Sequence, residues 1–108
     1  MIKASLEEAL SMFRKWLGDK ARLRFVASLK SIGMSCDCSV ISVSATKIGL
    51  SLPGQTVGVC SIELVGCEFF FGVDDIPSSE IGLPGLQLGS GISLITSDGQ
   101  SLWLIEAL

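Results

Sequence analysis

Apolar residues alternate with polar ones through most of residues 23 to 73, and this period of two limits the fold more than any other feature. Successive side chains of a strand point to opposite faces of a sheet, so the alternation predicts half-buried β-strands. The apolar positions change from even to odd numbers near Val40 and Ile41, and back again near Val59 and Cys60. Each change predicts a bulge or sharp bend, and two bent strands predict a closed or nearly closed barrel.

A helix is expected near the N-terminus, over residues 5 to 17. Ser5 and Glu8 have the spacing of a capping box, in which each side chain satisfies a backbone N–H at the start of a helix. Gly18 is placed to end the helix in a left-handed conformation. Apolar residues follow with the period of one helix face, namely Leu6, Ala9, Leu10, Phe13, Trp16 and Leu17. Such a stripe is typical of packing against a sheet, and binding to a partner or a membrane surface is the alternative.

The remaining segments predict strands, a long loop and a hairpin in one domain, residues 1 to 108. We expect strands from about residue 21 to residue 73. Residues 74 to 91 contain four of the twelve glycines and two of the three prolines, which is typical of a long connection. Asp98 and Gly99 lie between two apolar runs and predict a C-terminal hairpin over residues 92 to 107. The expected fold is mainly β, with an N-terminal amphipathic helix followed by a small antiparallel barrel or roll of about six to seven strands.

This plan of a capped helix followed by bent strands resembles that of Sm-like and other SH3-like small barrels. The resemblance is architectural and covers most of the chain. Sm proteins bind RNA through a basic and glycine-containing element in their later strands, and residues 48 to 108 contain no Lys, Arg or His to match it. The resemblance therefore implies a fold but no ligand, and we assign no family from it.

Charge is divided unevenly along the chain. Residues 1 to 47 carry eight basic residues against four acidic ones, whereas residues 48 to 108 carry seven acidic residues and no basic one. Four of these basic residues fall on one face of a predicted strand and are the candidate binding residues: Lys20, Arg22, Arg24 and Lys30. Such a strip suits phosphates or an acidic partner, although a simple solvated face is the ordinary alternative. The net charge of −3 argues against nucleic acid as the main partner.

We expect no catalytic residues, no metal and no cofactor. The chain has no His or Tyr, so its serines lack the base that a nucleophilic triad requires. Four cysteines fall at inward positions, and we expect them to pack as small apolar side chains, with a metal site and redox chemistry as alternatives: Cys36, Cys38, Cys60 and Cys67. Asp74 and Asp75, with Glu80 nearby, are expected to form a solvated turn rather than a cation or acid–base site.

These features together predict a non-enzymatic β-barrel module that acts through protein–protein association or self-assembly, as a homodimer or larger ring. Apolar Val26 and Phe70 at positions expected to face outward favour association. Anion, nucleotide or nucleic-acid binding through the basic strand face is the alternative. No apolar run reaches the roughly 18 residues of a membrane span. Glu7 and Glu8 stand where a signal peptide would be apolar, so we expect a cytoplasmic protein with no membrane partner.

Overall fold

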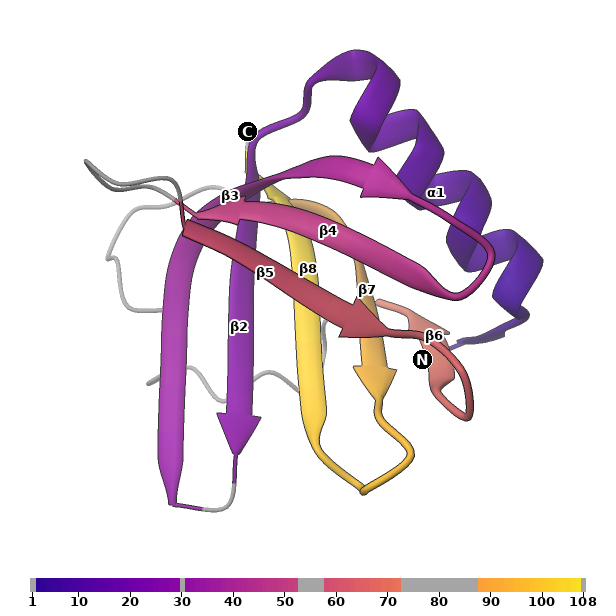
Figure 1. Cartoon of the computed structure of the whole chain (residues 1–108), viewed down its shortest axis with the longest axis vertical. Coiled ribbons are helices and arrows are strands. Elements are labelled where there is room, and N and C mark those ends of the chain that lie inside the picture. Colours follow the sequence, from indigo (N-terminus) through magenta and orange to yellow (C-terminus); the bar gives the residue numbers. More distant parts are fainter. Residues whose placement is uncertain (1, 30, 53–57, 73–87, 108) are drawn as a thin grey trace.

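The computed structural model describes residues 2–29, 31–52, 58–72 and 88–107, shown in Figure 1. This part of the chain is mainly β with one helix, as predicted. Its elements in chain order are β1 (Ile2–Ala4), α1 (Leu6–Asp19), β2 (Leu23–Leu29), β3 (Ile32–Val43), β4 (Lys47–Leu52), β5 (Gly58–Glu63), β6 (Glu68–Phe71), β7 (Leu88–Ile95) and β8 (Ser101–Ala107).

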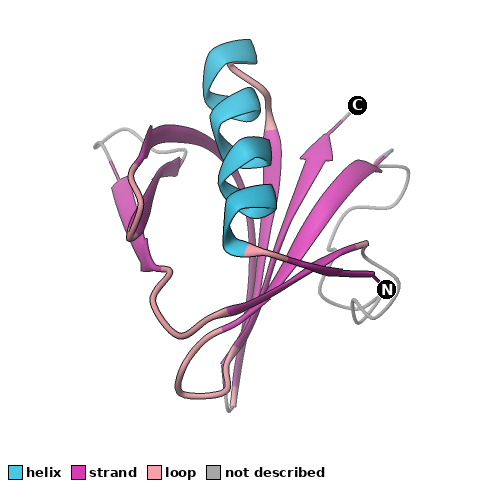
Figure 2. Ribbon diagram, turned by 90° about the vertical axis from the view of Figure 1, so that its right-hand side faces the viewer, coloured by secondary structure: helices cyan, strands magenta, loops and turns pink. Residues whose placement is uncertain are grey.

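The eight described strands form one antiparallel sheet, in the order β1-β6-β7-β8-β2-β3-β4-β5. β1 and β5 are the end strands and do not pair with each other, so the sheet is open over the described residues. The predicted closed or nearly closed SH3-like or Sm-like barrel is therefore not confirmed. Instead, the sheet bends strongly, so that β4 and β5 cross in front of β2 and β8 (Figure 1). Figure 2 shows the same bend from the side, with α1 running across the opening between the two parts of the sheet.

A bulge in β3 accounts for much of this bend. The pairing of β3 with β4 shifts by one residue between Val40 and Ser42, where the first change of phase predicted it. The bend predicted from the second change of phase, near Val59 and Cys60, is wrong. β4 and β5 pair in one unbroken register from Lys47–Glu63 to Leu52–Gly58. Val59, which suggested that second bend, is a regular strand residue and is 58% exposed.

Helix α1 begins as predicted but ends later. Ser5 is the N-cap, its hydroxyl accepts a hydrogen bond from the Glu8 N–H, and the Glu8 carboxylate accepts one from the Ser5 N–H, both at 3.1 Å. The left-handed C-cap is Lys20, with φ of 52°, rather than Gly18. The last turn continues past Gly18 because the N–H groups of Lys20 and Ala21 still reach helix carbonyl oxygens.

Most of the core lies between α1 and the face of the sheet toward which it packs. The helix contributes Ala9, Leu10, Phe13 and Trp16, all buried, to this core. Leu6 and Leu17, at the margins of the predicted stripe, are 39% and 36% exposed. The sheet residues of this core alternate along each strand, as in Leu23, Phe25 and Ala27 of β2 and Leu102 and Leu104 of β8.

A second, smaller apolar cluster lies on the opposite face of the sheet and consists of Val26, Trp103 and Ile105. Val26 and Trp103 are cross-strand partners in β2 and β8, and they are 0% and 4% exposed. The prediction that Val26 faces outward is therefore wrong, because this face also excludes water around the central strands. Phe70 is partly buried.

The long predicted loop is shorter than residues 74 to 91, since β7 already begins at Leu88. Residues 73–87, with the acidic group Asp74, Asp75 and Glu80, lie outside the described residues. β7 and β8 form an antiparallel hairpin around Gly99, whose φ is 85°, at the predicted Asp-Gly pair. Within the described part of the chain, α1 is too short and polar to count as a membrane-spanning helix.

Candidate functional site

A groove of about 460 Å³ lies between β5 and the parts of β2, β3 and β8 that it crosses; we call it the β5 groove. Its floor is apolar because Met34, Ala27 and Leu102 are paired across β3, β2 and β8 and thus share one face. Ala27 stands between the two larger side chains, and its single methyl group leaves the floor hollow. The other lining residues are Phe25, Cys60, Ser61, Ile62, Glu63, Thr96, Ser97 and Asp98.

β5 forms one wall of the groove and is also an end strand of the sheet. The Leu64 N–H bonds to the Thr46 carbonyl oxygen, which fixes the alternation of hydrogen bonds along this pair of strands. It follows that Cys60 and Ile62 exchange backbone hydrogen bonds with β4. The N–H and C=O groups of Val59, Ser61 and Glu63 point away from β4, toward the outer edge of β5.

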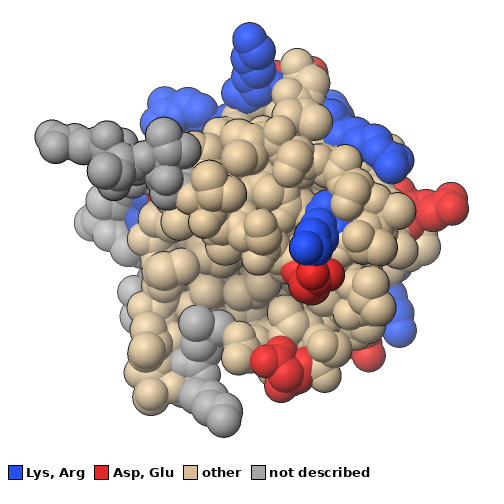
Figure 3. Space-filling view, in the orientation of Figure 1, with Lys and Arg blue, Asp and Glu red and all other residues tan. Residues whose placement is uncertain are grey.

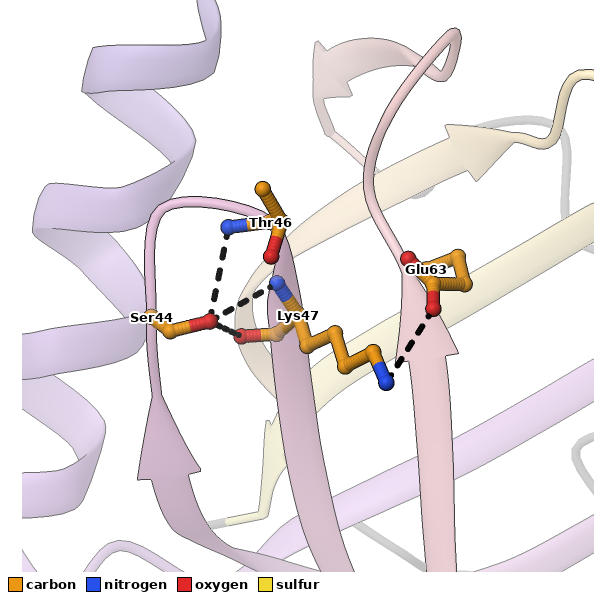
Figure 4. A network of polar contacts seen from close by, with 4 residues as sticks. All are labelled: Ser44, Thr46, Lys47 and Glu63. Atoms are coloured by element: carbon orange, nitrogen blue, oxygen red, sulfur yellow. Dashed lines mark hydrogen bonds and ion pairs between the residues drawn. The ribbon is translucent and has the colours of Figure 1, made fainter.

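A polar network at the β3–β4 turn holds this wall in place (Figure 4). The Ser44 hydroxyl accepts hydrogen bonds from the N–H groups of Thr46 and Lys47, at 3.4 and 3.1 Å, and donates one to the Lys47 carbonyl oxygen. The Lys47 ammonium then pairs with the Glu63 carboxylate of β5 at 3.3 Å. Both charged side chains are more than half exposed, so this pair positions the strand end and adds little stability.

The β7–β8 turn forms the opposite rim of the groove and carries Asp98. The Thr96 hydroxyl donates a hydrogen bond to the Asp98 carboxylate and accepts one from the Gln100 N–H. The positive φ of Gly99 allows the tight turn that these bonds require. The turn therefore presents a carboxylate at the mouth of an apolar groove.

The described rim of the groove carries two acidic residues, and one of them, Glu63, is paired with the exposed Lys47. Among the described residues, the lining of the groove contains two carboxylates, from Glu63 and Asp98, and no Lys or Arg. In Figure 3, Lys and Arg side chains lie mostly over the upper half of the face shown, where α1 ends. On this face, the basic side chains are therefore unevenly distributed. A ligand of the groove that carries positive charge is favoured electrostatically.

The structure describes three of the four basic residues predicted to form one binding strip. Lys20 caps α1 and Arg22 is exposed just before β2, while Lys30 lies outside the described residues. Arg24 is only 7% exposed, so the prediction that it faces solvent is wrong. Its guanidinium bonds to the Asp37 carboxylate at 3.0 Å and to the Ser35 hydroxyl at 2.9 Å. Asp37 is the only acidic residue between positions 20 and 62, which is the sequence signal that could have indicated this pair.

The cysteines are free thiols, and Cys38 is the most buried of them, with 7% of its surface exposed. Cys36, Cys60 and Cys67 are half-buried and pack against the core cluster that contains Cys38, so the predicted inward packing is confirmed for all four. Burial raises the pKa of the Cys38 thiol to about 12, with smaller contributions from the neighbouring Cys36 and Cys60 thiols. Among the described residues, no three Cys, Asp or Glu side chains are grouped so that they could hold a metal ion.

The raised pKa of Cys38 predicts that stability falls as the pH rises above about 9. An unfolded thiol ionises near its ordinary pKa of 9.0, whereas the folded one keeps its proton until about pH 12. Between these pH values the unfolded state loses more protons than the folded state. At about pH 10, Cys38 alone should lower the free energy of unfolding by about 1 kcal/mol. Urea unfolding at about pH 8 and about pH 10 measures this loss.

Cys38→Val is the control for this pH effect, because it removes the ionisable group and keeps an apolar side chain of similar size. We expect the variant to lose less stability than the wild type between the two pH values. An identical loss in both proteins would show that Cys38 does not contribute to the alkaline transition.

Comparison of the chain with protein-family models, with curated proteins and with solved structures found no match.

Proposed function

We propose that the protein is a small non-enzymatic module that associates with protein chains, copies of itself included, through the β5 groove. The observation that carries this proposal is an apolar groove of about 460 Å³ beside a strand edge with which no other described strand pairs. Its volume falls within the range of about 300–1,000 Å³ that is typical of ligand sites. Apolar side chains of a partner would gain free energy by leaving water for the surface around Ala27 and Met34.

The chemistry of the groove supports association rather than catalysis. Glu63 and Asp98 have no histidine beside them, because the chain contains none. Cys60 lines the groove, but burial raises the pKa of its thiol, and a protonated thiol is a poor nucleophile. We therefore propose a non-enzymatic role, with the β5 groove as the surface through which the protein acts. A cytoplasmic location is also proposed, from the sequence alone.

The alternative of anion or nucleotide binding through the basic strip receives less support. Arg24 is buried and already bonded to Asp37 and Ser35, which removes the central member of the predicted strip. Lys20 and Arg22 keep exposed charges, but neither is a lining residue of the β5 groove. Two exposed cations provide attraction but little selectivity by themselves.

Self-association is the form of this function that can be measured directly. We expect the wild type to associate in sedimentation velocity experiments at micromolar concentrations, and Met34→Asp to raise the dissociation constant at least tenfold. Met34 is 39% exposed, so covering the rest of it contributes only part of the roughly 1.5–3 kcal/mol of a full burial. A charge at the same position would also have to lose its water. About 1.4 kcal/mol corresponds to that tenfold change.

Ile41→Asp is the matched control for Met34→Asp. Both residues are apolar and belong to β3, and Ile41 is 46% exposed and Met34 39% exposed. Only Met34 of the two lines the groove. We expect Ile41→Asp to leave the dissociation constant unchanged. Equal weakening by both substitutions would place association outside the groove, and a wild type that stays monomeric up to high micromolar concentrations would contradict the proposal.

A further inference from the structure

The two end strands of the sheet differ in how well they are protected against pairing with another chain. β1 has three residues and carries Lys3, a short and charged edge of the kind that discourages further pairing. β5 has six residues, with no Pro and no Lys or Arg, and pairs with β4 without a bulge. Val59 is also 58% exposed on it. β5 is therefore the end strand better suited to accept an additional strand.

Within the described part of the chain, β5 pairs with β4 alone, so the backbone groups on its other edge have no strand partner there. The outward-pointing residues Val59, Ser61 and Glu63 alternate with those that bond to β4. The Glu63 carbonyl oxygen already accepts a hydrogen bond from the Cys67 thiol, at 3.2 Å, which closes one end of the edge. The N–H and C=O groups of Ser61 lie at the centre of the remaining edge, where this residue also lines the groove.

The floor of the β5 groove would receive the side chains of such a strand. A strand that pairs with β5 directs alternate side chains toward the two faces of the sheet. On one face these side chains would meet Ala27, Met34 and Leu102, the apolar floor described above. Strand addition of this kind obtains affinity from main-chain hydrogen bonds and specificity from pockets for alternate side chains.

Charge limits the kind of strand that fits. The Asp98 carboxylate is at the rim and Glu63 lies at the end of β5, and none of the described residues that line the groove is basic. Lys47 partly neutralises Glu63, so Asp98 contributes most of the local negative charge. We infer that β5 binds an extended segment of a partner protein, with aliphatic side chains at alternate positions over Ala27 and a Lys or Arg beside Asp98. This inference rests on the proposed association through the groove and names the partner.

A probe for the wild-type protein is selected from a displayed peptide library. The library has aliphatic residues fixed at alternate positions and random residues between them. We expect enrichment of Lys and Arg over Asp and Glu at the random positions. The enriched peptide is then synthesised with one backbone N-methyl group at each position in turn, and binding is measured by fluorescence anisotropy. Each N-methyl group removes one N–H donor, so affinity should fall at least tenfold at every second residue and little at the others.

Substitutions in the protein test the same contacts from the other side. Ser61→Pro removes the central outward N–H of β5 but none of the bonds to β4, since Pro is accepted at the outer side of an edge strand. Ser61→Ala keeps that N–H and is the matched control. We expect Ser61→Pro to lose the peptide and Ser61→Ala to keep it. Asp98→Asn should reduce the preference for Lys and Arg without abolishing binding.

The outcomes separate this inference from the proposed function. Failure to enrich any peptide overturns the inference, and so does an N-methyl scan without the two-residue alternation. Neither result affects self-association that responds to Met34→Asp, which would leave the proposed function in place. Should Ser61→Pro fail to fold, the N-methyl scan on the wild-type protein still decides the question.

Discussion

Replacing Phe13 by alanine is expected to lower the free energy of unfolding by about 3–5 kcal/mol. The side chain is 0% exposed and its ring lies 6.1 Å from that of Trp16, at the centre of the contact between α1 and the sheet. Truncation would remove apolar contacts from both the helix and the sheet and leave a cavity, because a close-packed core relaxes only in part. Urea unfolding followed by far-ultraviolet circular dichroism measures the loss.

Leu17→Ala is the control on the same helix. Leu17 is 36% exposed, so its truncation should cost clearly less than that of Phe13, about 1 kcal/mol or below. Both variants keep a good helix former at the substituted position, so intrinsic helix propensity does not explain a difference between them. Similar losses for the two variants would mean that α1 does not pack on the sheet through the face that buries Phe13.

The parts of the fold that the sequence predicted correctly have strong local signals. The capping box at Ser5, the Asp-Gly pair at Asp98 and the phase change at Val40 each act through neighbouring residues, so their effects can be read from a short stretch. β1 was not predicted, because a three-residue strand is too short to show an alternation. The predicted barrel depended on a second bend at Val59, and the regular pairing of β4 with β5 removes that basis.

The candidate site depends on pairings between distant segments, which sequence patterns do not report. The groove needs Met34, Ala27 and Leu102 side by side, and this juxtaposition follows from the order of β3, β2 and β8 in the sheet. Alternation placed Arg24 correctly on the face of β2 opposite to Leu23 and Phe25. It could not show that the facing residue of β3 is Asp37, which explains why a predicted binding residue is instead part of the structure.

Asp37→Ala is expected to destabilise the protein by about 1–3 kcal/mol, and more than Arg24→Met does. Without the carboxylate, the buried guanidinium keeps only the Ser35 hydroxyl of its two described side-chain partners. A fully buried pair would cost more to break, but the Asp37 side chain is 52% exposed and water can replace part of its interaction. Arg24→Met removes the charge itself while keeping a long side chain, so its cost should stay within about 1 kcal/mol.

The double variant Arg24→Met, Asp37→Ala completes a thermodynamic cycle in urea unfolding. Its stability should be close to that of Arg24→Met alone, because Asp37 has no cation to neutralise once Arg24 is gone. A larger loss for Arg24→Met than for Asp37→Ala would contradict a structural role limited to this pair. Inorganic phosphate provides an independent measurement: if Arg24 serves the fold rather than an anion, phosphate should stabilise the wild type no more than it stabilises Arg24→Met, since only a bound anion shifts the unfolding equilibrium selectively.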